Sequence, residues 1–199
     1  MQSDSQKRET GDDRRAAIAA ATRALIVQKG LEGLRMRDIA ASVGINIATL
    51  HYHVPSKEAL IELVAQSLKS EFRTQGMSRS RHGKSGLERL HMEFEDVLET
   101  QEQAPERLAV MAQLAERASR DAAIGAIMQP LRAHWHASLT AVFAAGAADG
   151  SMRADIDAEA AAQIFIGTVV GWRSSRPDRA QMLAVFAEFE RAFAVRSGK

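Results

Sequence analysis

The sequence lacks cysteine altogether and contains few aromatic residues. Without cysteine the chain can form neither a disulfide nor a thiolate metal site, which is typical of proteins in a reducing cytoplasm. Aromatic residues make up 5% of the 199 residues, whereas hydrophobic residues, many of them alanine, make up 46%. Because alanine and leucine favour helices while strands favour β-branched and aromatic residues, this composition predicts an all-α protein.

Signals for secretion and for membrane insertion are also missing. The N-terminal segment MQSDSQKRETGDD has no apolar stretch of the kind found in signal peptides. The longest strongly apolar run, residues 164–172, is much shorter than the roughly 20 residues that a membrane span needs. We therefore expect a soluble, cytoplasmic protein that has no membrane partner.

Apolar residues recur at helical spacing along most of the chain and predict about nine helices. No segment shows the strict alternation of a half-buried strand, so we expect no sheet. The predicted elements of the first part are a flexible tail at residues 1–11 and helices at residues 12–29, 36–43, 47–53 and 57–72. Farther along the chain, Pro130 predicts a kink or a break in a long helix.

The net charge of +1 conceals a division of the chain. Residues 1–85 carry 14 lysine and arginine residues against 9 acidic ones, whereas residues 86–199 carry 12 against 16. The basic, Gly- and Ser-rich stretch at residues 76–86 lies at this change of sign and predicts a loop. We therefore expect an N-terminal domain at residues 12–72 and a C-terminal domain at residues 73–199. The basic excess suggests an anionic partner for the first domain, although ordinary solvated faces also carry such biases.

Residues 33–57 have the pattern of a helix-turn-helix. Gly44 follows the first predicted helix at a place that favours a positive φ angle, and the small Ala40 lets the second helix approach closely. Asn46 can cap the second helix through its side-chain oxygen, as Ser56 can cap the helix that follows. The residues expected to face inward are Ile39, Val43, Ile45 and Leu50.

The outward side chains suit a helix that enters the major groove of DNA. Small residues near its start permit close approach to base edges, while hydroxyl, imidazole and cationic groups can donate to bases or phosphates. The residues predicted to contact DNA are Arg35, Arg37, Asn46, Ile47, Ala48, Thr49, His51, Tyr52, His53 and Lys57. The alternative is that the histidines and Lys57 are ordinary surface residues. The preceding helix, the capped helix that follows and the basic excess together favour DNA binding.

The segment DIAASVGINIATLHYHVPSKEALIELV, residues 38–64, resembles the N-terminal domain of the TetR (tetracycline repressor-like) regulators. The matching residues are Ile39, Ala40, Gly44, Thr49, Leu50, Tyr52, His53, Ser56, Lys57 and Glu58. A looser similarity to the same family begins at Trp135 and continues through MRADIDAEAAAQIFIGTVVGW at residues 152–172. The resemblance implies an all-helical subunit, a homodimer that binds operator DNA, and a C-terminal domain that senses a small ligand.

The sequence departs from the family pattern at two places. His51 and Val54 stand where the family usually has aromatic residues, and the Arg35–Met36 pair replaces a threonine. The resemblance implies that the phosphate contacts made there pass to His51 and Arg35.

The C-terminal domain contains candidates for a ligand pocket and for a dimer interface. Methionine, aromatic residues and a histidine on four predicted helices can line a pocket for a moderately apolar ligand, although each can equally be a plain core residue. These residues are His91, Phe94, Met111, Met128, Trp135, Phe165 and Val169. The Gly167-x-x-x-Gly171 spacing permits close approach of another helix, from the same chain or from a partner. The family resemblance implies a four-helix interface filled by Val169, Phe186, Phe189 and Phe193.

The sequence therefore predicts a DNA-binding regulator: a ligand-responsive, homodimeric repressor of a palindromic operator, with a C-terminal regulatory and dimerisation domain. No phosphate-binding loop, nucleophile elbow or motif-linked carboxylate pair suggests an enzyme, and no cofactor is predicted. His134 and His136 point to different helix faces, so we expect no metal site. One alternative is a helical interaction protein that has lost operator binding, which the changes at His51 and Val54 leave open. An all-helical enzyme is the least favoured alternative.

Overall fold

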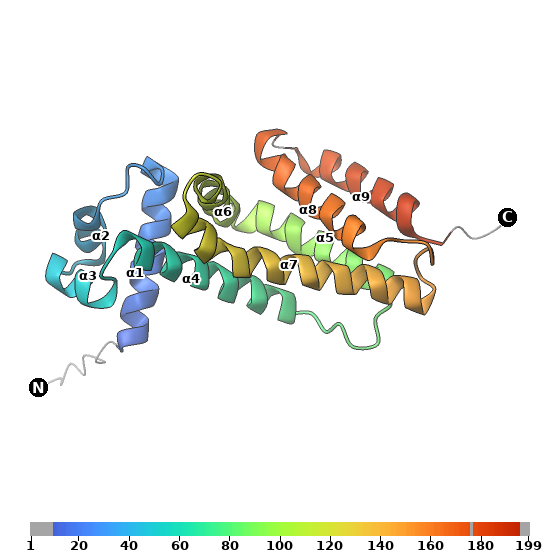
Figure 1. Cartoon of the computed structure of the whole chain (residues 1–199), viewed down its shortest axis with the longest axis horizontal. Helices are drawn as coiled ribbons and strands as arrows, with labels where there is room; N and C mark the ends of the chain where they lie inside the picture. Colours follow the sequence, from blue (N-terminus) through green and yellow to red (C-terminus); the bar gives the residue numbers. More distant parts are fainter. Residues whose placement is uncertain (1–9, 176, 196–199) are drawn as a thin grey trace, which may run out of the picture.

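The computed structural model describes residues 10–175 and 177–195, and within these residues the chain forms nine helices and no strand. The helices are α1 Gly11–Lys29, α2 Met36–Val43, α3 Ile47–His53, α4 Lys57–Met77, α5 Gly86–Gln103, α6 Pro105–Ala118, α7 Ala122–Asp149, α8 Ala158–Ser175 and α9 Arg179–Phe193. They form an elongated bundle with α2 and α3 at one end and the α8–α9 hairpin toward the other (Figure 1). The all-α prediction is confirmed, and no helix in the described part of the chain is long and apolar enough to cross a membrane.

Capping explains where the first helices begin and end. The predicted bounds of α2 and α3 agree with the structure, and α1 begins one residue early because Thr10 forms a capping box with Asp13. Residues 1–9 of the predicted tail lie outside the described residues. Helix α4 continues to Met77 rather than ending at residue 72, since the Gln75 side chain near its end is bonded to α5.

Helix α7 runs through Pro130, so of the predicted kink or break the break is wrong. Proline removes only the hydrogen bond to the carbonyl of Ala126. Packing holds both halves of the helix, because Met128 is buried in one apolar cluster and Phe143 in another.

Two apolar clusters form the core, and each of them contains residues from segments that are not consecutive in the sequence. The first joins α1–α4 to residues of α6 and of the first part of α7, namely Val110, Leu114, Ile124 and Met128. The second joins α5 and the rest of α7 to α8 and α9. The predicted division at residues 72 and 73 therefore does not separate two cores.

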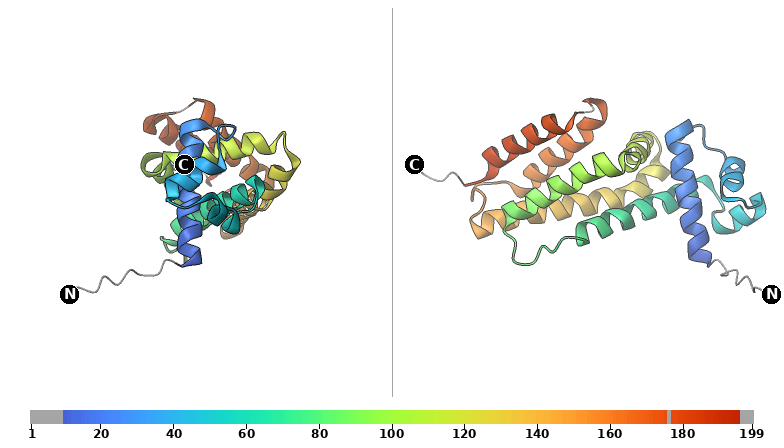
Figure 2. Two further views of the ribbon diagram at one scale, coloured as in Figure 1. Left: turned by 90° about the vertical axis from the view of Figure 1, so that its left-hand side faces the viewer. Right: turned by 180° about the vertical axis from the view of Figure 1, so that it is seen from behind.

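Helices α5 and α7 cross closely at a pair of glycines, and they lie side by side in both Figure 1 and the rear view of Figure 2. A methyl group at Gly86 would lie 2.1 Å from the nitrogen of Gly146. Asp149, at the end of α7, accepts a hydrogen bond of 2.7 Å from the Gly86 N–H. The end of α7 thus helps to cap the start of α5.

Candidate nucleic-acid interface

The turn between α2 and α3 has the geometry that the sequence predicts. Gly44 ends α2 at φ 72° and ψ 32°, in the left-handed region. The N–H of Ile45 then bonds to the Ala40 carbonyl at 3.0 Å. Ile39 and Leu50 are fully buried, and Val43 and Ile45 pack against the same cluster. This packing supplies the stability that a helix of seven residues lacks on its own.

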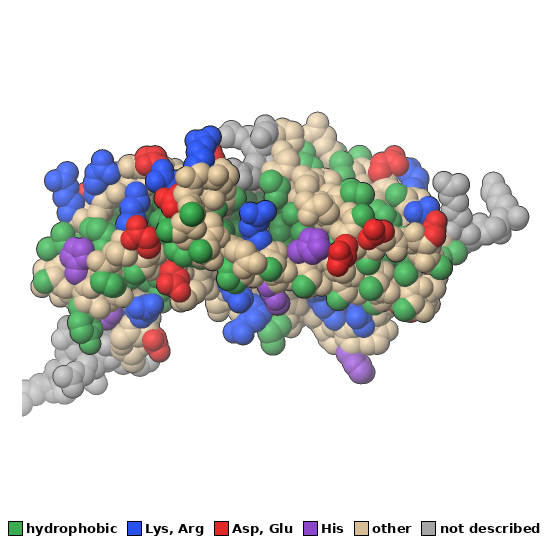
Figure 3. Space-filling model, in the orientation of Figure 1, with side chains coloured by type: hydrophobic (Ala, Val, Ile, Leu, Met, Phe, Trp, Pro, Cys, Tyr) green, Lys and Arg blue, Asp and Glu red, His purple; other side chains and the backbone are tan. Residues whose placement is uncertain are grey.

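Helix α3 presents most of its side chains to solvent at the end of the molecule. Tyr52 is 85% exposed, Ile47 is about half exposed, and Ala48 and His51 are exposed. Thr49 and His53 are half-buried. The view toward this end in Figure 2 shows α2 and α3 side by side with α1 beside them. In Figure 3 lysine, arginine and histidine side chains occur on the same end, among apolar ones.

Side-chain caps fix the starts of α3 and α4. The Asn46 Oδ1 accepts a hydrogen bond of 2.7 Å from the Thr49 N–H, and the Ser56 Oγ accepts one of 3.1 Å from the Ala59 N–H. Asn46, one of the predicted DNA contacts, therefore has a structural role with its oxygen. Lys57, the first residue of α4, is exposed beside α3.

The two arginines that flank the start of α2 differ in their surroundings. The guanidinium of Arg35 donates to the carbonyls of Glu32 and Leu34, at 2.9 and 3.3 Å. The Arg37 side chain is 82% exposed, and its nearest carboxylate is that of Asp38 at 3.7 Å. Arg37 is thus better placed to reach a phosphate than Arg35, which is held against its own loop.

Val54 and His51, the two departures from the expected aromatic residues, behave differently in the structure. Val54 is buried at the C-terminal end of α3, where its N–H bonds to the Leu50 carbonyl at 2.9 Å. Its side chain is therefore part of the core and not of the outer surface. His51 is exposed and keeps a donor on the outer face.

Helix α1 holds both helices of the motif through polar contacts that the sequence does not predict. Lys29 Nζ lies 2.8 Å from an Asp38 oxygen on α2, and its hydrogen bond holds the pKa of that carboxyl below its usual range. Arg15 Nη1 donates to the carbonyl of His53, at the end of α3, at 2.9 Å. A partner 38 residues away leaves no local signal in the sequence.

Comparison with known families decides what this architecture is. The family model described as bacterial regulatory proteins of the tetR family matches residues 18–64, which contain the helix-turn-helix. The model of the C-terminal domain of BetI-type transcriptional repressors matches residues 86–191, more than half of the chain. The chain belongs to the TetR family. The prediction of a DNA-binding transcriptional regulator is thereby confirmed.

Solved structures have the same fold as this TetR-family chain. A transcriptional regulator from Saccharomonospora viridis, in complex with choline, matches with a TM-score of 0.81 and 21% identity, over 93% of this chain and 100% of that one. A TetR-family regulator from Agrobacterium tumefaciens matches with a TM-score of 0.78 and 24% identity, over 93% of this chain and 100% of that one. AibR, in complex with isovaleryl coenzyme A and operator DNA, matches with a TM-score of 0.72 and 22% identity, over 90% of this chain and 98% of that one. No curated protein matches the sequence.

The residues predicted to line a ligand pocket do not come together at one place. Four of them belong to the second apolar cluster, which α8 and α9 complete: Phe94, Trp135, Phe165 and Val169. Met111 and Met128 belong to the first cluster instead, and His91 lies at the surface, 3.5 Å from Glu190. A hollow of about 440 Å³ between α4 and the α5–α6 corner is lined by none of the seven.

The centre of the second cluster is a group of stacked aromatic rings. The ring of Phe94 lies 3.7 Å from that of Phe186 and 5.2 Å from that of Phe165, measured between centroids. Phe189 contacts both Phe94 and Phe165 edge-on. These rings fill the space between α5, α8 and α9.

The residues predicted for the dimer interface lie on opposite sides of α8 and α9. Phe186 and Phe189 are each 7% exposed because they face the interior of their own subunit. They therefore leave little side-chain surface for an interface with a partner, whereas Phe193 packs on Phe143 and is only half-buried. Gly167 and Gly171 are exposed, and a methyl group at either would meet no described atom within 4 Å.

The C-terminal domain is joined to the helix-turn-helix unit by helix α6. Its Gln113 side chain donates to the carbonyl of Ile26 at 3.1 Å and accepts from the N–H of Leu31 at 2.9 Å, so it holds the end of α1. Glu71 on α4 binds both Arg23 of α1, at 2.6 Å, and Arg107 of α6, at 2.8 Å.

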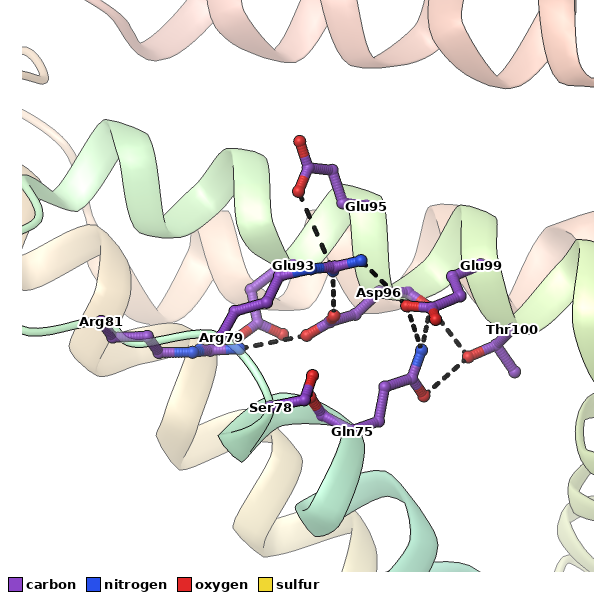
Figure 4. Close-up of polar contacts among 9 residues, drawn as sticks. All are labelled: Gln75, Ser78, Arg79, Arg81, Glu93, Glu95, Asp96, Glu99 and Thr100. Atoms are coloured by element: carbon purple, nitrogen blue, oxygen red, sulfur yellow. Dashed lines mark hydrogen bonds and ion pairs between the residues drawn. The ribbon is translucent and has the colours of Figure 1, made fainter.

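A further ionic cluster fixes the C-terminal end of α4 against α5 (Figure 4). Arg79, in the loop between them, lies 2.6 Å from Asp96 and 2.9 Å from Glu99, and Arg81 pairs with Asp96 and Glu93. Both arginines come from the stretch that the sequence identifies only as a basic loop.

Proposed function

We propose that this TetR-family protein is a homodimeric, ligand-responsive repressor that binds a palindromic operator through helix α3 of each subunit. The observation that carries the proposal is the construction of α3. The helix is capped at its start by Asn46, anchored by the buried Leu50 and Val54, and exposes the other side to solvent. A rigid, exposed helix at the end of the molecule suits insertion into a major groove.

The exposed side chains divide by the contacts that their chemistry permits. Ile47, Ala48 and Thr49 lie in the first turn, where a recognition helix meets base edges. Tyr52 and Lys57 carry donors that suit phosphate oxygens. The remaining phosphate donors are His51, His53 and Arg37, while Asn46 and Arg35 support the motif.

The dimer forms, in this proposal, through the outer faces of α8 and α9. These faces carry the exposed apolar residues Ile164, Val170 and Leu183, together with the open surface at Gly167 and Gly171. Small and apolar residues let helices of two subunits pack closely. A two-fold dimer places two α3 helices about 34 Å apart, one turn of DNA, and so accounts for a palindromic site.

The effector, in this proposal, enters the second apolar cluster and is moderately apolar. Opening the stacked rings of Phe94, Phe165 and Phe186 would create a cavity between α5, α8 and α9. Two structural relatives were solved in complex with choline and with isovaleryl coenzyme A, which supports a ligand-binding role. The ligand shifts operator affinity only if it binds the two arrangements of the α3 helices unequally. We propose no enzymatic activity, and a cytoplasmic location follows from operator binding.

Operator binding is tested with fragments of the DNA upstream of the protein's own gene. We expect a palindromic fragment to bind more tightly than a scrambled fragment of equal length, in a fluorescence anisotropy titration. Affinity should fall steeply as salt rises, because each neutralised phosphate contributes about 0.9 to the slope of log K against log salt. Absence of salt-sensitive binding to any native promoter fragment would instead favour a helical interaction protein. Compounds that release the bound fragment then identify the effector class.

A further inference from the structure

The side chain of Arg15 crosses from α1 to the C-terminal end of α3. Its Nη1 donates to the carbonyl of His53, the last residue of α3, at 2.9 Å, and this contact is partly buried. Lys29, near the other end of α1, makes the 2.8 Å contact with Asp38 of α2. Helix α1 therefore contacts each helix of the motif through a separate cation.

The carbonyl of His53 has a particular need for a donor. The last carbonyls of a helix have no partner within it, and in α3 the Val54 N–H already bonds to Leu50. The negative end of the helix dipole also favours a positive charge at this point. Because α3 has only seven residues, a single bond at its end acts on a large part of the helix.

We propose that Arg15 is a positioning residue for operator recognition, one that sets the placement of α3 against α1 without itself contacting DNA. The inference rests on the proposed operator binding. Asn46 fixes the start of α3, and the buried Leu50 and Val54 hold its inner side. The bond from Arg15 adds a directional contact to helix α1 at the end that carries Tyr52 and His53.

The competing interpretation is that Arg15 is one more cation that neutralises a phosphate. Its surroundings argue against that role, because its Nη1 is engaged by a backbone carbonyl in a partly buried contact. Arg37, by comparison, is 82% exposed and close only to Asp38. The two arginines therefore form a matched pair for an experiment, since replacing either one removes a single positive charge.

The experiment compares Arg15→Met with Arg37→Met in the full-length protein. Binding to the operator fragment and to the scrambled fragment is measured over a range of salt concentrations. We expect Arg15→Met to lower the preference for operator over scrambled DNA about tenfold, the effect of one charge-assisted hydrogen bond, with an unchanged salt slope. Arg37→Met should weaken binding to both DNA fragments by a similar factor and reduce the salt slope by about one.

Amide hydrogen exchange provides a second measurement that needs no DNA. In Arg15→Met the amides of α3, including Leu50 and Val54, should exchange faster, while those of α7 keep their protection. Arg15→Lys retains the charge but shortens the donor, so it should leave the salt slope unchanged and restore the operator preference only in part.

The outcomes separate the two proposals. If the wild type shows no preference for any native fragment, operator binding itself is wrong, and exchange in α3 still decides whether Arg15 holds the helix. If the wild type discriminates and Arg15→Met discriminates equally well, or loses salt slope as Arg37→Met does, the positioning role of Arg15 is wrong. A loss of protection throughout the chain would also overturn it, because Arg15 would then support the whole fold.

Discussion

Asp96 shows how burial can outweigh close ion pairs at a single residue. Its carboxylate lies 2.6 Å from Arg79 and 3.2 Å from Arg81, and both cations favour the ionised form. Burial between α5 and the loop acts in the other direction, and the carboxylate of Glu93 adds to it. Together they raise the pKa of Asp96 to about 6. The cluster in Figure 4 contains more carboxylates than arginines, and this repulsion between carboxylates adds to the larger effect of burial.

The raised pKa of Asp96 predicts a pH dependence of stability with a definite sign. The folded protein holds this proton more tightly than the unfolded chain, so the stability that Asp96 contributes is lost as the pH rises through about 6. Asp96→Asn is neutral at every pH and lacks this loss. The unfolding free energy of Asp96→Asn relative to the wild type should therefore increase from about pH 5 to about pH 7.5, as measured by urea denaturation.

A control for the pH experiment is Asp155→Asn, which replaces a carboxylate that is largely exposed. Its unfolding free energy relative to the wild type should change less between the same two pH values. If the unfolding free energy of Asp96→Asn relative to the wild type were the same at both pH values, the pKa of Asp96 would not be raised in the folded protein.

At the scale of helices, local caps could be predicted from sequence and distant contacts could not. The bounds of α2 and α3 follow from Gly44 and Asn46, whose effects reach only a few residues along the chain. The bond from Arg15 to His53 and the close crossing of Gly86 and Gly146 join residues that periodicity cannot relate. Both contacts depend on how the helices are arranged in three dimensions.

The crossing of α5 and α7 predicts a severe effect for a small substitution. In Gly86→Ala the new methyl group would lie 2.1 Å from backbone of Gly146, which no side-chain movement can relieve. We expect the free energy of unfolding to fall by about 3 kcal/mol, as for overpacking in a rigid core, measured by urea denaturation. The matched control is Gly76→Ala, where the methyl group meets only the end of the Arg81 side chain at 3.6 Å. If both variants were equally stable, the close crossing would be wrong.

At the scale of the whole molecule, sequence patterns identified the fold and the helix-turn-helix but did not assign a function to the core residues. Methionines and phenylalanines at helical spacing suit a pocket, an interface or a core equally well. The structure separates these roles by burial, since Phe186 and Phe189 face inward while Leu183, on the same helix, faces solvent. Burial against distant helices depends on the tertiary arrangement, so the periodicity of a single helix cannot predict it.

The exposed face of α8 and α9 predicts where the proposed dimer can be disrupted. In Leu183→Glu a charge would be buried against the partner, so the dissociation constant should rise by about tenfold or more, as followed by sedimentation over a range of concentrations. Val27→Glu is the control, because Val27 on α1 is 47% exposed and Leu183 is 45% exposed. Equal effects of the two variants, or a monomeric wild type, would contradict an α8–α9 interface.

The shared first cluster has a consequence for recombining this protein with its relatives. Val110, Leu114 and Met128 pack against α1–α4, although they are encoded well beyond the helix-turn-helix. A chimaera joined in the loop after Met77 would replace the side chains of α6 and α7 in that cluster with foreign ones, and α1 and α4 would then pack against them. If α3 reads DNA as proposed, an exchange of DNA specificity should transplant α6 and the first turns of α7 together with α3, or else replace only the outer face of α3.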